Sequence, residues 1–219
     1  MNNMKKLDIR MKAGDVAEVM LYGTIGSSFW EDGVSASQFR KEIKAIKAGT
    51  INLRINSPGG STVEAAAMMA ALDEHPARIE VDIDGMAASA ASVVAMAGDT
   101  VRANGGALVM IHNPWTSVGG GAEDMRRTAD LLDKVRETIL DAYLRKSART
   151  RAELAAMMDA ETWFTAQEAK DAGLVDEVGA GRAVAACAGL ERFGYAKIPQ
   201  AATAAWAEHA RRKEIAARL

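Results

Sequence analysis

Short apolar runs alternate with helix-like segments along most of the chain, and this alternation limits the possible folds more than any other feature. Apolar runs that predict strands lie at 18–25, 51–56, 79–84 and 107–112. Segments with helical spacing lie between them at 35–49, 61–75 and 89–98. Strands that are separated by helices need right-handed crossovers, so this order predicts an α/β fold with repeated βαβ units and a largely parallel sheet.

The longest helical pattern covers residues 123–147. Met125, Leu132 and Ile139 recur every seven residues, and alanine and valine fill the stripe between them. Such a stripe can pack on its own domain or pair with another subunit. The pattern alone leaves both open.

Composition excludes several classes of protein. The 219 residues carry 27 basic and 29 acidic side chains without long blocks of one sign, which argues against nucleic-acid binding. The single cysteine, Cys187, allows no intramolecular disulfide, and no Cys/His cluster suggests a metal site. The first residues do not resemble a signal peptide, and the small-residue run at 85–98 is too short to span a bilayer. We therefore expect a cytoplasmic protein with no membrane partner.

Unusual residues follow three of the expected strands. Asn56-Ser57-Pro58-Gly59-Gly60 follows the second strand, Asp84-Gly85 the third and His112-Asn113-Pro114 the fourth. Functional groups of parallel sheets gather at the carboxyl ends of the strands. The coincidence predicts a site at this edge.

Ser89 has a suitable position for a nucleophile. We expect it shortly after strand 79–84, beyond a glycine turn and at the start of the next helix. Free N–H groups and a partial positive charge at a helix start favour an anion there. The alternative is that Ser89 is only an N-cap, with Ser92 one turn further along the helix.

A serine nucleophile needs a base, and the base needs a third group to orient it. Of the three histidines, His75 precedes a proline at a helix end, where capping is expected, and His209 lies among charges near the C-terminus. His112 ends an apolar strand at the predicted edge.

The glycines of loop 57–60 expose N–H groups, and the loop lacks the GxxxxGK[ST] pattern of a nucleotide site.

Four motifs in one order carry a resemblance to a known family. INSPGG (55–60), DGMAASAAS (84–92), MIHNP (110–114) and ETWFTAQEAKDAGLVDEV (161–178) resemble the motif set of the ClpP family of serine peptidases. The resemblance implies a ClpP/crotonase-like fold with a protruding handle helix, through which a homo-oligomer would form at 123–147. It also implies a serine endopeptidase that needs no metal and no organic cofactor.

The resemblance implies roles for individual residues. Ser89 takes the place of the nucleophile and His112 that of the general base. The N–H groups of Ala90 and of Gly60, or Gly59, take the place of the oxyanion hole.

The third member of the triad departs from the family pattern. Trp-Phe-Thr-Ala at 163–166 aligns with a stretch that follows the family's aspartate, so Glu161 takes the aspartate's place. Glutamate can orient a histidine in such triads. Asp159, two residues earlier, remains the alternative.

The resemblance also suggests a setting. MIHNPW and DAETW look most like the ClpP-like proteases of tailed phages, which implies processing of capsid or scaffold protein during head assembly. Whether an ATP-driven unfoldase takes part stays open. We expect an N-terminal segment at 1–17, a peptidase domain at 18–180 and an Ala-rich, partly helical tail at 181–219.

Three other functions compete with this interpretation. One is a crotonase-type enzyme that acts on coenzyme A thioesters, although the sequence lacks an obvious basic patch for the nucleotide. The second is a Ser–Lys peptidase of the signal-peptide-peptidase type, against which His112 argues. The third is a catalytically silent assembly scaffold with the same fold.

Overall fold

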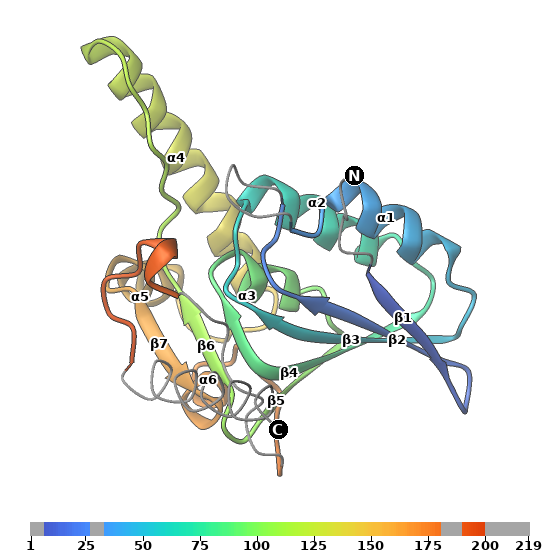
Figure 1. The fold of residues 1–219 in the computed structure, drawn as a ribbon. Coiled ribbons are helices and arrows are strands. Elements are labelled where there is room, and N and C mark those ends of the chain that lie inside the picture. Colours follow the sequence, from blue (N-terminus) through green and yellow to red (C-terminus); the bar gives the residue numbers. More distant parts are fainter. Residues whose placement is uncertain (1–6, 27–32, 181–189, 200–219) are drawn as a thin grey trace, which may run out of the picture.

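The computed structural model describes residues 7–26, 33–180 and 190–199, which form one sheet with helices packed around it (Figure 1). The strands are β1 (Asp8–Lys12), β2 (Val16–Tyr22), β3 (Thr50–Ser57), β4 (Arg78–Ala88), β5 (Thr100–Asn104), β6 (Leu108–Ile111), β7 (Thr162–Thr165) and β8 (Glu177–Gly179). The helices are α1 (Ala36–Ala45), α2 (Thr62–Asp73), α3 (Ala90–Ala95), α4 (Ala122–Leu144), α5 (Arg151–Asp159) and α6 (Ala166–Asp171), with a 3₁₀ turn, η1, at Leu190–Phe193.

The sheet is mostly parallel. Its strand order is β1-β2-β3-β4-β5-β8, and β6 pairs with β4 and with β7. Only the pairs β1–β2 and β6–β7 are antiparallel. The predicted α/β fold with a largely parallel sheet is confirmed, although the short strands β1, β5, β7 and β8 were not expected.

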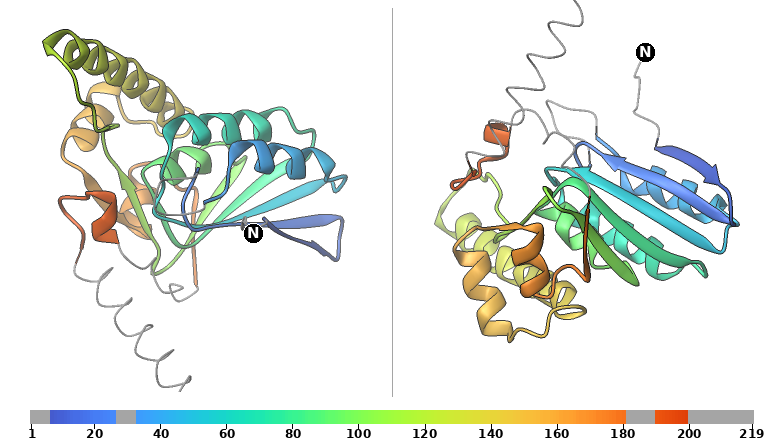
Figure 2. Two further views of the ribbon diagram at one scale, coloured as in Figure 1. Left: turned by 45° about the horizontal axis from the view of Figure 1, so that its top comes forward. Right: turned by 90° about the horizontal axis from the view of Figure 1, so that it is seen from below.

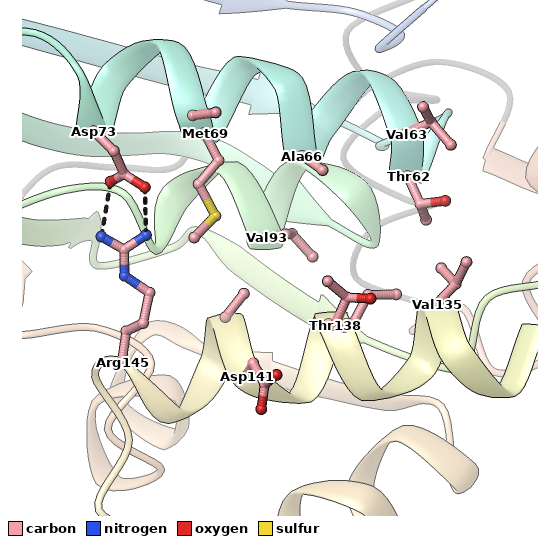
Figure 3. Close-up of a pocket in the computed structure, with 13 residues that line it drawn as sticks. Thr62, Val63, Ala66, Met69, Asp73, Val93, Val135, Thr138, Asp141 and Arg145 are labelled. Carbon is pink, nitrogen blue, oxygen red and sulfur yellow. Dashed lines mark hydrogen bonds and ion pairs between the residues drawn. The ribbon is translucent and has the colours of Figure 1, made fainter.

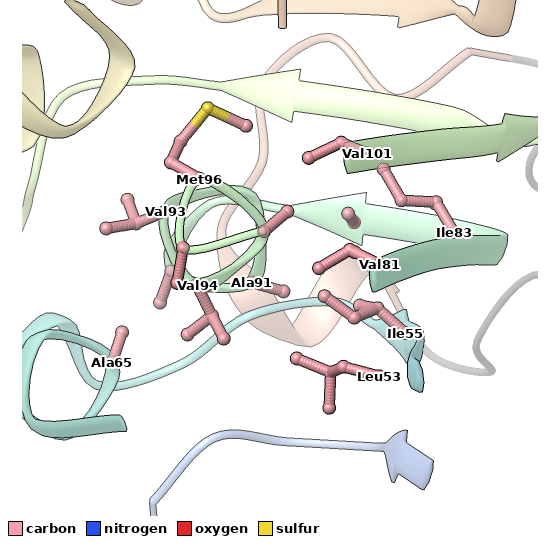
Figure 4. Packing of buried hydrophobic residues seen from close by; sticks show 14 of the residues in the cluster. Leu53, Ile55, Ala65, Val81, Ile83, Ala91, Val93, Val94, Met96 and Val101 are labelled. Carbon is pink, nitrogen blue, oxygen red and sulfur yellow. The ribbon is translucent and has the colours of Figure 1, made fainter. Parts of the chain in front are cut away.

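Helices α1, α2 and α3 cover one face of the sheet (Figures 1 and 2). The core lies between them, where branched side chains of the strands meet small side chains of the helices (Figure 4). Leu53, Ile55 and Val81 are fully buried on the sheet side, and Ala65 and Ala91 on the helix side. Because alanine has little bulk, α3 packs close to the strands that carry the site.

Strand β4 changes its neighbour part-way along its length. Glu80–Ile83 pair with β5, whereas Met86–Ala88 pair with β6. The register against β3 shifts in between, as in a β-bulge. The predicted strand end at Asp84 and the glycine turn after it are therefore wrong, because β4 continues directly to Ala88.

The buried carboxylate of Asp84 lies at this irregularity and joins three neighbouring strands. It accepts hydrogen bonds from the Tyr22 hydroxyl (2.5 Å), Arg54 Nε (2.9 Å) and Asn104 Nδ2 (3.2 Å), which belong to β2, β3 and β5. Burial and the bond to Asp84 raise the pKa of Tyr22 to about 12, and the same carboxylate raises the pKa of Arg54. The network fixes the strands where β4 leaves β5 for β6.

Helix α4 projects from the body of the molecule (Figure 1). Its buried residues lie near its C-terminal end, from Ile139 to Tyr143, whereas Met125 and Leu131 are 41% and 60% exposed. The structure confirms a protruding handle helix and places its bounds at 122–144 rather than 123–147.

Parts of both expected terminal segments belong to the packed structure. Asp8–Lys12 form β1 and pair with β2. Residues 190–199 pack against β4, β6 and β7 through a small apolar cluster around Met86, Met110 and Trp163. Cys187 and His209 lie outside the described residues.

Two findings concern only the described part of the chain. None of its helices combines the length and apolar character needed to cross a bilayer. Its His, Cys, Asp and Glu side chains form no group of three that could hold a metal ion.

We predict that Asp84→Asn lowers the free energy of unfolding by about 3 kcal/mol, because it leaves Arg54 without its buried partner. Glu74→Gln is the matched control, since Glu74 pairs with Arg40 on the exposed surface and its loss should cost less than about 1 kcal/mol. Urea unfolding followed by circular dichroism measures both. Equal effects of the two substitutions would contradict the role of Asp84.

Candidate active site

Ser89 lies on a sharp turn between β4 and α3. Its φ of 54° and ψ of −125° are rare for a residue with a side chain, and its backbone N–H donates to the Met110 carbonyl at 2.9 Å. Although Ser89 occupies the N-cap position, its side chain makes no capping bond. Such strained turns hold nucleophilic serines with the hydroxyl free to react.

The hydroxyl of Ser89 contacts His112 instead. Ser89 Oγ lies 2.8 Å from His112 Nε2. The pairing of β4 with β6 places Ala88 opposite Met110, so the residues that follow the two strands meet. When Nε2 accepts the serine proton, Nδ1 carries the imidazole hydrogen. The structure thus brings together the two residues that the sequence predicts as nucleophile and base.

Ser92 and His75 have structural contacts. Ser92 is fully buried, and its Oγ lies 2.6 Å from the Ser89 carbonyl oxygen and 2.8 Å from the Tyr143 hydroxyl. His75 lies after α2, where its Nδ1 accepts a hydrogen bond from Ala77 N–H at 3.1 Å. Neither side chain contacts the hydroxyl of Ser89.

The glycine loop after β3 packs directly against Ser89. A Cβ on Gly59 would lie 2.5 Å from the Ala88 carbonyl oxygen, and Gly59 has a φ of +94°, so only glycine fits. The Gly59 N–H already donates to Ser57 Oγ at 3.1 Å. Gly60 is exposed, and no acceptor for its N–H lies among the described residues.

Ala90 supplies a second N–H group beside Ser89. It is the first residue of α3, so its N–H has no partner within the helix. Of the donors predicted from the sequence, Gly60 and Ala90 are therefore available to an oxyanion, and Gly59 is engaged.

Glu161 is the carboxylate that affects His112. Burial lowers the pKa of His112, and the negative charge of Glu161 partly opposes this, although no hydrogen bond joins the two side chains. Its oxygens accept from the backbone N–H groups of Ala196 (2.8 Å) and Lys197 (2.7 Å). Burial would raise the pKa of Glu161, but these N–H groups hold it below its usual value.

Asp159 makes different contacts. It accepts hydrogen bonds from Asn113 Nδ2 and from Arg136, both at 2.8 Å, and its side chain is 57% exposed. The bond from Asn113 and the charge of Arg136 lower the pKa of Asp159. The carboxylate of Asp159 thus pairs with Arg136, whereas the carboxylate that acts on His112 is that of Glu161.

Two of the candidate site residues, Ser89 and Glu161, also have unusual backbone conformations. Of the three non-glycine residues with positive φ in the described ranges, two are Ser89 and Glu161, at 54° and 48°, and the third is Asp15 in a turn. Strained residues with side chains cluster at functional sites. The geometry therefore favours Glu161 over Asp159 as the acid near His112.

Sequence reasoning missed Tyr195. Its hydroxyl donates to the Pro58 carbonyl, and its ring meets the His112 ring edge to face at 5.4 Å. One signal could have pointed to it, since Phe-Gly-Tyr at 193–195 places two aromatic residues close together in an Ala-rich tail.

Comparisons with known proteins place this arrangement in a family. The sequence model described as Clp protease matches residues 3–182. The chain belongs to the Clp protease family.

Members of the Clp protease family with similar sequences include proteolytic subunits from several bacteria. The "ATP-dependent Clp protease proteolytic subunit 2" of Corynebacterium glutamicum is 34% identical over 130 residues, which cover 58% of this chain and 65% of that protein. The "ATP-dependent Clp protease proteolytic subunit" of Bacteroides fragilis is 34% identical over 132 residues, with 58% and 63% covered. These two alignments thus span less than two thirds of the relatives' own length. The corresponding subunit of Streptococcus pneumoniae is 29% identical over 168 residues, with 73% and 83% covered.

We predict that His112 titrates below the usual value of about 6.5. Burial lowers its pKa by disfavouring the charged ring, and the charge of Glu161 only partly opposes this. Diethyl pyrocarbonate modifies neutral imidazole, so the rate of His112 modification should rise with pH to a midpoint below 6.5, as peptide mapping would show.

The same assay on two variants shows whether Glu161 or Asp159 acts on His112. Glu161→Gln should lower the midpoint further, because it removes the charge that favours the imidazolium ion. Asp159→Asn should leave the midpoint unchanged. The opposite pattern would transfer the role to Asp159.

Proposed function

We propose that this Clp protease family member is a serine endopeptidase that cleaves unfolded polypeptides through an acyl-enzyme. The observation that carries the proposal is the 2.8 Å contact between Ser89 Oγ and His112 Nε2, beside the available N–H groups of Gly60 and Ala90. This set supplies the nucleophile, base and oxyanion donors that attack on a peptide carbonyl needs, which supports the proposal.

The first half of the reaction forms the acyl-enzyme. Ser89 Oγ bonds to the carbonyl carbon while His112 Nε2 takes the hydroxyl proton. The N–H groups of Gly60 and Ala90 donate to the oxyanion, and each such donor typically contributes about 10²–10³-fold in rate. The C–N bond then breaks, and His112 gives its proton to the leaving amine.

The second half regenerates the enzyme. His112 takes a proton from water, the hydroxide attacks the ester, and Ser89 leaves as the hydroxyl after it recovers the proton. His112 must be neutral at the start of each half. Burial lowers the pKa of His112, which favours the neutral form.

The alternatives fit the site less well. A Ser–Lys peptidase requires an amine beside the nucleophile, whereas the side chain that contacts Ser89 Oγ is an imidazole. A thioester enzyme of the crotonase type needs the N–H donors but neither Ser89 nor His112. A silent scaffold would have no use for a serine held at a φ of 54°.

A finer proposal concerns the substrate. The resemblance of MIHNPW and DAETW to phage-encoded proteases supports capsid or scaffold protein as the natural substrate. The names of the bacterial relatives describe subunits of ATP-dependent proteases. An unfolded test substrate needs no unfolding partner. It therefore tests peptide-bond cleavage whether or not an ATP-driven unfoldase takes part.

We predict that Ser89→Ala abolishes cleavage of unfolded fluorescent casein, with a loss on the order of 10⁴-fold or more. The matched control is Ser92→Ala, three residues away, which removes a buried hydroxyl with structural contacts and should keep most of the activity. Cleavage by Ser89→Ala at the wild-type rate would overturn the proposal.

We also propose that copies of this chain associate through α4. The apolar side chains of Met125 and Leu131 are exposed on this helix. An apolar groove of about 600 Å³ lies between α4 and α2, where Val63, Met69 and Ile139 line it (Figure 3). An ion pair between Asp73 and Arg145 lies at one end of the groove.

We predict that Leu131→Arg lowers the mass of the particle in solution, because a charge replaces an apolar contact between subunits. Light scattering after size exclusion measures that mass. Lys44→Glu on the exposed surface of α1 serves as the control and should leave the mass unchanged. An unchanged particle in Leu131→Arg would exclude this face of α4.

A further inference from the structure

A short segment from the C-terminal part of the chain, Tyr195–Lys197, contacts several parts of the active site. Tyr195 is 9% exposed, its hydroxyl donates to the Pro58 carbonyl of the glycine loop, and its ring packs on His112 at 5.4 Å. The rings of Phe193 and Tyr195 stack with centroids 5.9 Å apart, and Trp163 and Tyr195 meet edge to face at 5.6 Å. Three rings therefore pack against the Tyr195 ring.

The same segment holds Glu161. The backbone N–H groups of Ala196 and Lys197 donate to its two carboxylate oxygens at 2.8 and 2.7 Å. Lys197 Nζ also donates to the carbonyl of Ala160, the residue before Glu161. These bonds fix the carboxylate whose charge acts on His112.

The contact with Pro58 bears on the oxyanion donors. A peptide unit is planar, and the carbonyl and N–H of a trans unit point in opposite directions. Tyr195 binds the carbonyl of the Pro58–Gly59 unit, and Ser57 Oγ accepts from the N–H of that unit. The carbonyl and the N–H of the Pro58–Gly59 unit are therefore both fixed. The direction of the next N–H, that of Gly60, depends on the orientation of this unit.

We propose that Tyr195 is a positioning residue of the active site, which holds the glycine loop through its hydroxyl and the imidazole of His112 through its ring. The inference rests on the proposed peptidase function. It assigns a role to a segment that lies beyond the residues matched by the family, which end at 182. Tyr195 does not touch the reacting atoms and acts through Pro58 and His112.

Exposure argues for positioning rather than for blocking. With Tyr195 in place, Gly60 is still exposed and Ser89 is only partly buried. A segment that occludes the site would cover both. A peptide can reach the nucleophile and the loop while the segment stays bound.

Steady-state cleavage of a fluorogenic peptide tests the role of the hydroxyl. Tyr195→Phe keeps the ring and removes the bond to Pro58, so kcat should fall about 10-fold or more while KM changes little. Ile198→Ala is the matched control, because Ile198 packs in the same apolar cluster and lies outside the segment Tyr195–Lys197. It should keep the wild-type kcat.

The titration of His112 tests the role of the ring without relying on turnover. Tyr195→Ala exposes the imidazole, so the midpoint of its modification by diethyl pyrocarbonate should rise towards 6.5, whereas Tyr195→Phe should keep the wild-type midpoint. If the wild type cleaves nothing but the midpoint shifts as expected, the peptidase proposal fails and the positioning contact stands.

Two results would overturn the inference. An unchanged kcat in Tyr195→Phe together with an unchanged midpoint in Tyr195→Ala would mean that the segment only adds stability. Faster cleavage by either variant would mean that Tyr195 obstructs the site.

Discussion

The buried carboxylate of Asp84 determines where the sheet of this protein branches. It binds side chains of β2, β3 and β5 at the point where β4 leaves β5 and begins to pair with β6. A buried charge is tolerated only with such partners. A shift of these strands would leave the Asp84 carboxylate buried without its hydrogen bonds, which would cost much free energy. The branch makes β4 and β6 neighbours, and the residues that follow them are Ser89 and His112.

The small residues around Ser89 allow close packing and leave room around its hydroxyl. Alanines of α3 are buried against the sheet, which lets the helix start directly after β4. Gly59 approaches the Ala88 carbonyl so closely that any side chain there would collide. The stretch DGMAASAAS is therefore poor in bulk because a helix and a glycine loop both come near one hydroxyl.

Much of this arrangement could be predicted from the sequence. The alternation of apolar runs and helices predicted the parallel sheet, and strand-end residues predicted that Ser89, His112 and the glycine loop would meet. The bulge in β4 could not be predicted, because it depends on hydrogen bonds between Asp84 and distant strands. Three-residue β8 is too short to show any periodicity.

Local sequence patterns could not decide between Glu161 and Asp159, nor predict the contacts of the C-terminal segment, for a similar reason. Glu161 and Asp159 are two residues apart and chemically alike, and only their partners separate them: backbone N–H groups for one and Arg136 for the other. Tyr195 lies 137 residues from Pro58 in sequence. No spacing rule predicts such a contact, which forms because an apolar cluster holds the segment on the sheet.

The central claim is that His112 activates Ser89, and intact-mass analysis after reaction with a fluorophosphonate tests it most directly. The wild type should gain one adduct per chain, mapped to Ser89, because the 2.8 Å contact gives the hydroxyl a base. His112→Ala should lose the adduct. An adduct at another residue, or equal labelling of the His112→Ala variant, would contradict the account.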